Sequence, residues 1–328
     1  MKPKQYLQVN CIITIIIFIL KTKKILFGSL LSIIGFLSNQ EILKANELKI
    51  VALDGVLCDL TKTLVDKKVK VNCIIPPEAD PHTFNLRPSD KKFISASNVI
   101  FHNGFNLTPS INKIPKTKNI VAVAEIALNS YSGEDPHVWH DPNNSMKMLK
   151  VITTNLKSLL PEREINNIKE RESRARQILN EIDNWAQLQF QTIPNGQKVL
   201  VTNHQAYSHL ADRYQIKQIT MLDSFTTGGV LRPSSLNKIS SAITESGALT
   251  IFPEKSIPNK TLKRISKRTG VPISSNQLFP EGVAKGKSYV GTFMSNVCSV
   301  VNGQGGTCNE ASGDQLDLRW KNLVNKNI

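Results

Sequence analysis

LKIVALDGVLCDLTKTLVDKKVKVNCIIPP, residues 48–77, contains an apolar run, an amphipathic run and a second apolar run in succession. Residues 48–54 predict a buried strand, and residues 56–65 predict a helix whose leucines share one face. Residues 69–75 predict a second strand, which two prolines end. Strand, helix and strand in this order are typical of a parallel α/β sheet.

The same alternation continues along the chain and restarts after a long helical stretch. We expect further strands at residues 98–102, 119–123, 198–202, 218–222, 248–253 and 272–275. We expect helices at residues 144–160, 161–191, 205–214, 233–246 and 259–269, with a final helix at 287–301. The predicted fold class is α/β, with two lobes whose parallel sheets are flanked by helices, joined by one long rigid linker helix. The predicted divisions are an N-terminal lobe at 46–160, a linker helix at 161–193 and a C-terminal lobe at 194–328.

Residues 1–45 predict an export signal. Two apolar runs, residues 12–20 and 25–37, are separated by a basic segment, and neither reaches the about 20 residues that a membrane-spanning helix needs. The second run has the basic flank and polar exit of a signal peptide, with cleavage expected after Ala45 although Leu43 is large for that site. The alternative is an uncleaved membrane anchor that uses both runs. In either case we expect the rest of the chain to be periplasmic or otherwise extracytoplasmic.

Composition favours a soluble two-domain protein. The 328 residues are 40% hydrophobic and 20% charged, and the length is about twice that of a typical single domain. The net charge is +15, but the basic residues form several small groups, residues 260–268 among them, and no recognised nucleic-acid motif accompanies them. We therefore interpret the excess charge as a solvated basic surface, and we expect no nucleic-acid partner.

Four cysteines follow the leader, which itself holds Cys11. An even number is compatible with two disulfides in an oxidising compartment. Four cysteines allow three pairings, and we expect the local one, Cys58 with Cys73 and Cys298 with Cys308. The alternative is four buried thiols. The absence of a CxxC pair argues against a zinc ribbon.

Three of the six histidines, His82, His137 and His204, lie in loops beside Asp-Pro or Asn, near predicted strand ends. Ligands of open α/β sheets bind outside the carboxyl ends of the strands, so loops from both halves can converge on one cleft. Imidazole suits zinc, copper, iron and nickel, and tolerates manganese when carboxylates complete the shell. Glu281 is the expected fourth ligand, and Glu254 is the alternative. Three imidazoles and a carboxylate with no open position describe a closed binding site rather than a catalytic one.

Three segments resemble the motifs of one family. Residues 80–90, DPHTFNLRPSD, resemble its DPHxxxxxPSD motif, and residues 135–142, DPHVWHDP, resemble its DPHxWxDP motif. Residues 201–207, VTNHQAY, resemble its VTxHxAF motif. Over residues 48–305 the chain therefore resembles the cluster 9 metal-binding proteins, the zinc and manganese solute-binding subunits of ABC transporters.

The resemblance implies two lobes joined by one rigid helix, with small motion on binding. It also implies ligand roles for His82, His137 and His204 and, by placement, for Glu281. The family usually has Asp where Glu281 stands, but a carboxylate is retained, so we expect binding to survive. Zinc-specific members often carry a His-rich loop between the first two ligands, whereas residues 103–133 contain no histidine. This removes one indication of zinc without establishing manganese.

The other three histidines are not expected to bind the metal ion. His140, three residues after His137, is expected beside the site or on the surface, and His102 and His209 are expected to be structural. Three nitrogen ligands favour zinc over the harder manganese ion.

The predicted function is capture of one Zn(II) or Mn(II) ion by a monomer that is not an enzyme, and its delivery to an ABC permease in the membrane. One alternative is a metal-dependent hydrolase, which needs an open coordination position and a general base. The HExxH, GxSxG and P-loop signatures are absent. The other alternative is a surface adhesin of the same fold. Because histidines bind metal when neutral, affinity should fall as the pH drops through about 6.5.

Overall fold

A computed structural model describes residues 48–227, 233–255 and 257–325 of the chain. The predicted export signal, residues 1–45, lies outside these residues. Within the part that is described, no helix is both long enough and apolar enough to cross a membrane.

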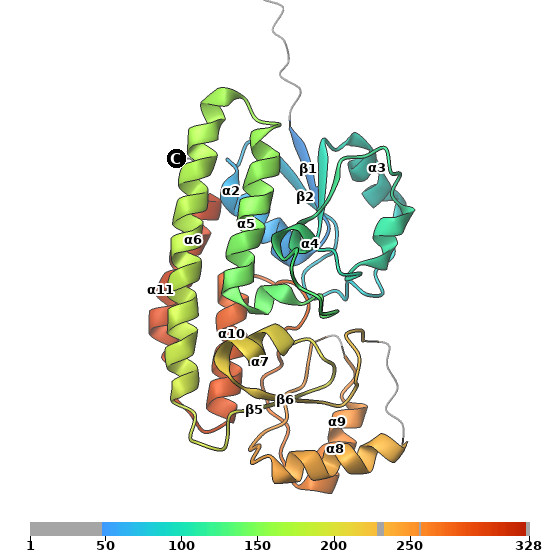
Figure 1. The fold of residues 1–328 in the computed structure, drawn as a ribbon, viewed down its shortest axis with the longest axis vertical. Coiled ribbons are helices and arrows are strands. Elements are labelled where there is room, and N and C mark those ends of the chain that lie inside the picture. The colour runs from blue at the N-terminus through green and yellow to red at the C-terminus, as the bar shows by residue number, and fades with distance from the viewer. Residues whose placement is uncertain (1–47, 228–232, 256, 326–328) are drawn as a thin grey trace, which may run out of the picture. The chain divides into compact units, whose positions relative to one another are not determined.

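The first half of the described chain is built on a four-stranded parallel sheet in the order β2-β1-β3-β4 (Figure 1). Its strands are β1 (Lys49–Ala52), β2 (Lys70–Cys73), β3 (Val99–His102) and β4 (Ile120–Ala122). Successive residues of β1 belong to different apolar clusters, with Ile50 in one and Val51 in the other. Both faces of the sheet are therefore buried, which explains why its central strands are continuously apolar.

Helices follow these strands and carry the chain back across the sheet. They are α2 (Gly55–Leu64), α3 (Pro88–Ala96), η1 (Pro109–Lys113), α4 (Val123–Ala127) and η2 (Val138–His140). The carboxylate of Asp54 begins α2 by accepting a hydrogen bond from the Leu57 amide at 2.9 Å. The predicted leucine face of α2 is buried, as its apolar spacing requires.

Two long helices follow, α5 (Pro142–Lys157) and α6 (Glu162–Gln191). The helix predicted at residues 161–191 is thus confirmed as one continuous element of 30 residues. In Figure 1, α6 extends alongside both halves of the described chain, and α10 (Tyr289–Gly303) and α11 (Glu310–Asn325) pack against it.

The prediction that the helix at 287–301 is the last one is wrong, because α11 follows it. The indole nitrogen of Trp320 in α11 donates a hydrogen bond to Asp59 in α2 at 2.5 Å, so the C-terminal helix packs on the first half. The predicted divisions at 46–160, 161–193 and 194–328 stay a prediction, and the contacts of α11 cross them.

The second half has a smaller parallel pair, β5 (Val199–Thr202) and β6 (Lys217–Thr220). Its helices are α7 (Ser208–Tyr214), α8 (Pro233–Glu245) and α9 (Lys260–Thr269). The strands predicted at 248–253 and 272–275 form only isolated parallel bridges, such as Ile251 with Ile273. Pro253 and Pro272 lie in these segments, and proline has no amide hydrogen for a strand ladder.

The cysteines form the two local disulfides that we expected. Cys58 of α2 is bonded to Cys73 of β2, and Cys298 of α10 is bonded to Cys308. The alternative of four buried thiols is therefore wrong. The first bond joins a helix to its neighbouring strand, and the second fixes the turn between α10 and α11.

Candidate metal site

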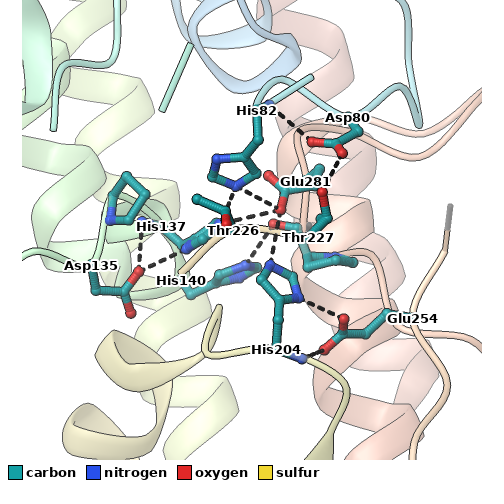
Figure 2. Close-up of polar contacts among 12 residues, drawn as sticks. Asp80, His82, Asp135, His137, His140, His204, Thr226, Thr227, Glu254 and Glu281 are labelled. Atoms are coloured by element: carbon teal, nitrogen blue, oxygen red, sulfur yellow. Dashed lines mark hydrogen bonds and ion pairs between the residues drawn. The ribbon is translucent and has the colours of Figure 1, made fainter. Parts of the chain in front are cut away.

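The four residues predicted as ligands lie together. His82 comes from the loop after β2, His137 precedes η2, His204 follows β5, and Glu281 lies in the loop before α10. One ligand atom from each lies within 4.8 Å of the others (Figure 2). The structure therefore brings together loops from both halves, while metal binding by these residues stays a prediction.

The spacing of the four ligand atoms resembles that around a tetrahedral ion. Glu281 Oε1 lies 3.3 Å from His82 Nε2, 3.1 Å from His137 Nε2 and 3.2 Å from His204 Nε2. The Nε2 atoms of His82 and His137 are 3.2 Å apart. Zinc bonds of 2.0–2.1 Å in a tetrahedron place neighbouring ligand atoms about 3.3 Å apart. Four of the six edges thus have the length that a tetrahedral zinc site requires.

Two of the histidines are held by carboxylates on the far side of their rings. His137 Nδ1 lies 2.7 Å from Asp135 Oδ1, and His204 Nδ1 lies 2.6 Å from Glu254 Oε2 (Figure 2). Both histidine side chains are fully buried. A carboxylate at Nδ1 fixes the ring orientation and, in the neutral ring, leaves Nε2 free to bind a metal.

This arrangement requires a cation among the four groups. In neutral His137 and His204 the proton lies on Nδ1, so the Nε2 lone pair points at Glu281 Oε1, which is also an acceptor. Two acceptors about 3 Å apart repel unless a proton or a metal ion lies between them. The geometry is that of a site made to hold positive charge.

The pKa values of these groups also favour a positive charge at the site. Burial lowers the pKa of His137, but the carboxylates of Glu281 and Asp135 outweigh it and raise the pKa to about 9. Burial likewise opposes protonation of His204, yet Glu254 and Glu281 raise its pKa to about 10. Burial raises the pKa of Glu281, but the imidazoles hold it well below its ordinary value.

Glu254, the alternative fourth ligand, has another role. Its Oε1 accepts hydrogen bonds from the backbone amides of Asn203 and His204, and its Oε2 bonds the His204 ring. It lies outside the group of four ligand atoms and orients one of them. The orienting role of Asp135 was not predicted, although its place two residues before His137 was a usable signal.

His82 is held differently from the other two. Asp80 accepts from the His82 amide at 2.9 Å, and its other oxygen accepts from Thr227 at 2.5 Å. Among the described residues, the buried His82 Nδ1 has no hydrogen-bond partner. A cavity of about 440 Å³, partly lined by His82, Phe105 and Phe225, opens beside this ring. His82 is therefore the ligand nearest to solvent.

The remaining histidines lie outside the group. His140 is buried rather than on the surface, and its Nε2 donates toward the Pro280 carbonyl at 3.0 Å, beside Glu281. His209 Nε2 lies 3.3 Å from the Asp135 carbonyl. His102 ends β3 and is half-buried. Within the described residues, the metal-capable group includes none of these three.

Comparison with known proteins identifies the family. Residues 50–303 match the model of the family described as zinc-uptake complex component A, periplasmic (ZnuA). The chain belongs to this family. The resemblance to metal solute-binding proteins that we predicted from three motifs is thereby confirmed.

Curated relatives of this ZnuA-family chain are substrate-binding proteins of ABC transporters. The metal ABC transporter substrate-binding lipoprotein of Lactococcus lactis is 28% identical over 278 residues, which cover 78% of this chain and 88% of that protein. The manganese ABC transporter substrate-binding lipoprotein PsaA of Streptococcus anginosus is 26% identical over 309 residues, which cover 87% and 98%. These relatives are binding proteins and not enzymes.

Solved structures share the fold of this ZnuA-family chain. The periplasmic zinc-binding protein TroA of Treponema pallidum has a TM-score of 0.72 at 24% identity, covering 78% of this chain and 98% of that chain. Fe(III)-bound YtgA of Chlamydia trachomatis has a TM-score of 0.74 at 21% identity, covering 80% and 99%. The predicted α/β fold class is confirmed.

Proposed function

We propose that this chain captures one divalent transition-metal ion, zinc or manganese, with His82, His137, His204 and Glu281, and delivers it to an ABC permease in the membrane. The observation that carries the proposal is the convergence of the three Nε2 atoms on Glu281 Oε1 at 3.1–3.3 Å. The names of the curated relatives support the class of cargo.

The donor set favours zinc. Three imidazoles and one carboxylate at tetrahedral spacing suit zinc, whereas manganese prefers more oxygen ligands and higher coordination. Manganese remains part of the proposal because curated relatives such as PsaA are named for manganese. A competition experiment that loads the metal-free protein with both ions decides between them.

The site supports binding without catalysis. All four ligand atoms come from the protein, and their side chains are at most 4% exposed, which leaves no open position for a substrate water. We further propose that the protein acts as an exported monomer, with residues 1–45 as signal peptide or anchor and residues 161–193 as the linker between its lobes.

Metal content tests the proposal directly. Elemental mass spectrometry of the purified protein should find about one zinc or manganese ion per chain. The His82→Ala/His204→Ala double variant should lose the ion, whereas His102→Ala, which removes a histidine outside the group, should keep it. A chain that stays free of both ions after loading, with its fold intact by circular dichroism, would contradict the proposal.

A further inference from the structure

Helix α9 has an unusually basic surface. Its sequence, KTLKRISKRT, contains five basic residues and no acidic one. These five lie at spacings of three and four residues, so they share one face, and all are exposed: Lys260, Lys263, Arg264, Lys267 and Arg268.

The apolar residues of α9 are fully used inside the protein. Leu262 and Ile265 are buried in the apolar cluster that also contains Leu236 of α8 and Val199 of β5. The outer face of α9 therefore has no apolar or aromatic side chain. The helix therefore presents five positively charged side chains on one exposed face.

These cations have no partner among the residues that the structure describes. None of the five forms an ion pair, whereas basic residues of other helices do, such as Arg174 with Glu170 and Lys321 with Asp317. Helix α8, which packs against α9, adds one lysine, Lys238, and one glutamate, Glu245. Like charges four residues apart destabilise a helix, so this face does not help the fold.

We propose that the basic face of α9, defined by the five residues above, docks on the surface of an anionic phospholipid bilayer. A protein interface is anchored by buried aromatic and apolar residues, and single-stranded nucleic acid stacks on aromatic rings, but this face has neither. Adsorption to anionic headgroups needs only charge near the surface. The proposal goes beyond metal capture and stands whichever ion is bound.

Docking in this way leaves the metal site accessible. In Figure 1, α8 and α9 lie at the end of the second half away from β1–β4, with β5 and β6 between. No residue of α9 lines the cavity beside His82. Docked in this way the protein is kept at the membrane, where a permease would receive the ion, and α9 does not cover the cavity beside His82.

The test compares two variants that lose the same charge. In one, Lys260, Lys263, Arg264, Lys267 and Arg268 are all changed to Gln. In the control, five exposed lysines of the first half are changed to Gln: Lys67, Lys68, Lys70, Lys91 and Lys92. The full chain is used in each case, so any binding caused by residues 1–47 is the same in both variants and cancels in the comparison.

Binding is measured by co-sedimentation with phosphatidylcholine vesicles and with vesicles containing about one third phosphatidylglycerol. The natural chain and the control should bind the anionic vesicles at least about tenfold more tightly than the α9 variant, and salt of about 0.5 M should abolish the difference. Metal content and thermal melting confirm that both variants are folded. Equal losses in the two variants, or an α9 variant that loses heparin binding but keeps vesicle binding, would overturn the proposal.

Discussion

The two Asp-Pro-His segments have the same three residues but hold their histidines in different ways. In both, the aspartate accepts a hydrogen bond from the histidine amide at 2.9 Å. Asp135 also reaches the His137 ring at 2.7 Å, whereas the outer oxygen of Asp80 accepts from Thr83 and Thr227. The same local turn therefore places a carboxylate against the His137 ring but leaves the His82 ring without a carboxylate partner.

This difference separates a rigid side of the site from a less constrained one. His137 is fully buried and oriented by a carboxylate, while His82 lies beside a cavity and its Nδ1 has no partner within the described residues. Ligand groups that are held in place lose less entropy when they bind. We therefore expect His137 to contribute more to affinity than His82.

The largest expected effect is the loss of either histidine. An apparent binding free energy of about 10–16 kcal/mol over four ligands is about 2.5–4 kcal/mol each, or two to three orders of magnitude in affinity. We expect His137→Ala to weaken zinc binding by about a thousandfold and His82→Ala by about a hundredfold, because water from the cavity can replace His82. Competition with a chelator measures both. Equal losses would contradict the distinction between the two sides.

The next effect concerns the aspartates themselves. Asp135→Asn keeps a side-chain oxygen that can accept from the His137 amide but removes the charge at the His137 ring, which should reduce metal affinity about 10- to 100-fold. Asp80→Asn is the matched control, because Asp80 does not touch the His82 ring, and it should change affinity by less than about threefold. Isothermal titration of both variants measures this. If Asp80→Asn were as harmful as Asp135→Asn, support of the ring would not explain the difference.

The pH dependence of affinity should reflect the carboxylates that surround the His137 ring. Burial lowers the pKa of His137, but Glu281 and Asp135 raise it to about 9, so the ring is protonated at neutral pH and must lose its proton to bind metal. Affinity should therefore rise between pH 6 and 9 by up to about tenfold per unit for each proton displaced. This range extends well above the ordinary imidazole pKa of about 6.5, on which the expectation from the sequence is based.

Removal of the Asp135 charge tests the cause of this dependence. The Asp135→Asn variant lacks one of the carboxylates that raise the His137 pKa, so its affinity should change less with pH than that of the natural chain. Zinc titrations across this range in both proteins give the two slopes. Identical slopes would mean that Asp135 does not control protonation of the site.

The fold was predictable where apolar periodicity is strong. The buried strands at β1 and β5 and the helix α6 were found at nearly their observed bounds. The helix α11 was missed even though Leu316, Trp320 and Leu323 recur along it at helical spacing and are buried, so its apolar pattern was a usable signal. The segments around Ile251 and Ile273 were too short and too close to prolines to form a ladder.

The site was predictable as a set of residues but not as an arrangement. The sequence indicated His82, His137 and His204 through three motifs and Glu281 through its placement after the last predicted strand, and the structure groups the four. It could not assign Glu254 an orienting role, since that role depends on the hydrogen bond from the Phe252 amide to the Val201 carbonyl, which brings Glu254 beside the start of the His204 loop. Tertiary contacts of this kind leave no periodic signal.

The smallest expected effect lies at the contact between the two halves beside His82. Thr227, from the second half, donates to Asp80 at 2.5 Å and so tethers the loop that carries His82. A single hydrogen bond contributes about 1 kcal/mol, so Thr227→Val should weaken metal binding by about three- to tenfold, through faster release. Stopped-flow chelation measures the rate, and Thr83→Val, which removes the other hydroxyl on Asp80 without loss of a contact between the halves, is the control. If Thr83→Val accelerated release as much as Thr227→Val, the rate would depend on the Asp80 turn itself and not on its contact with the second half.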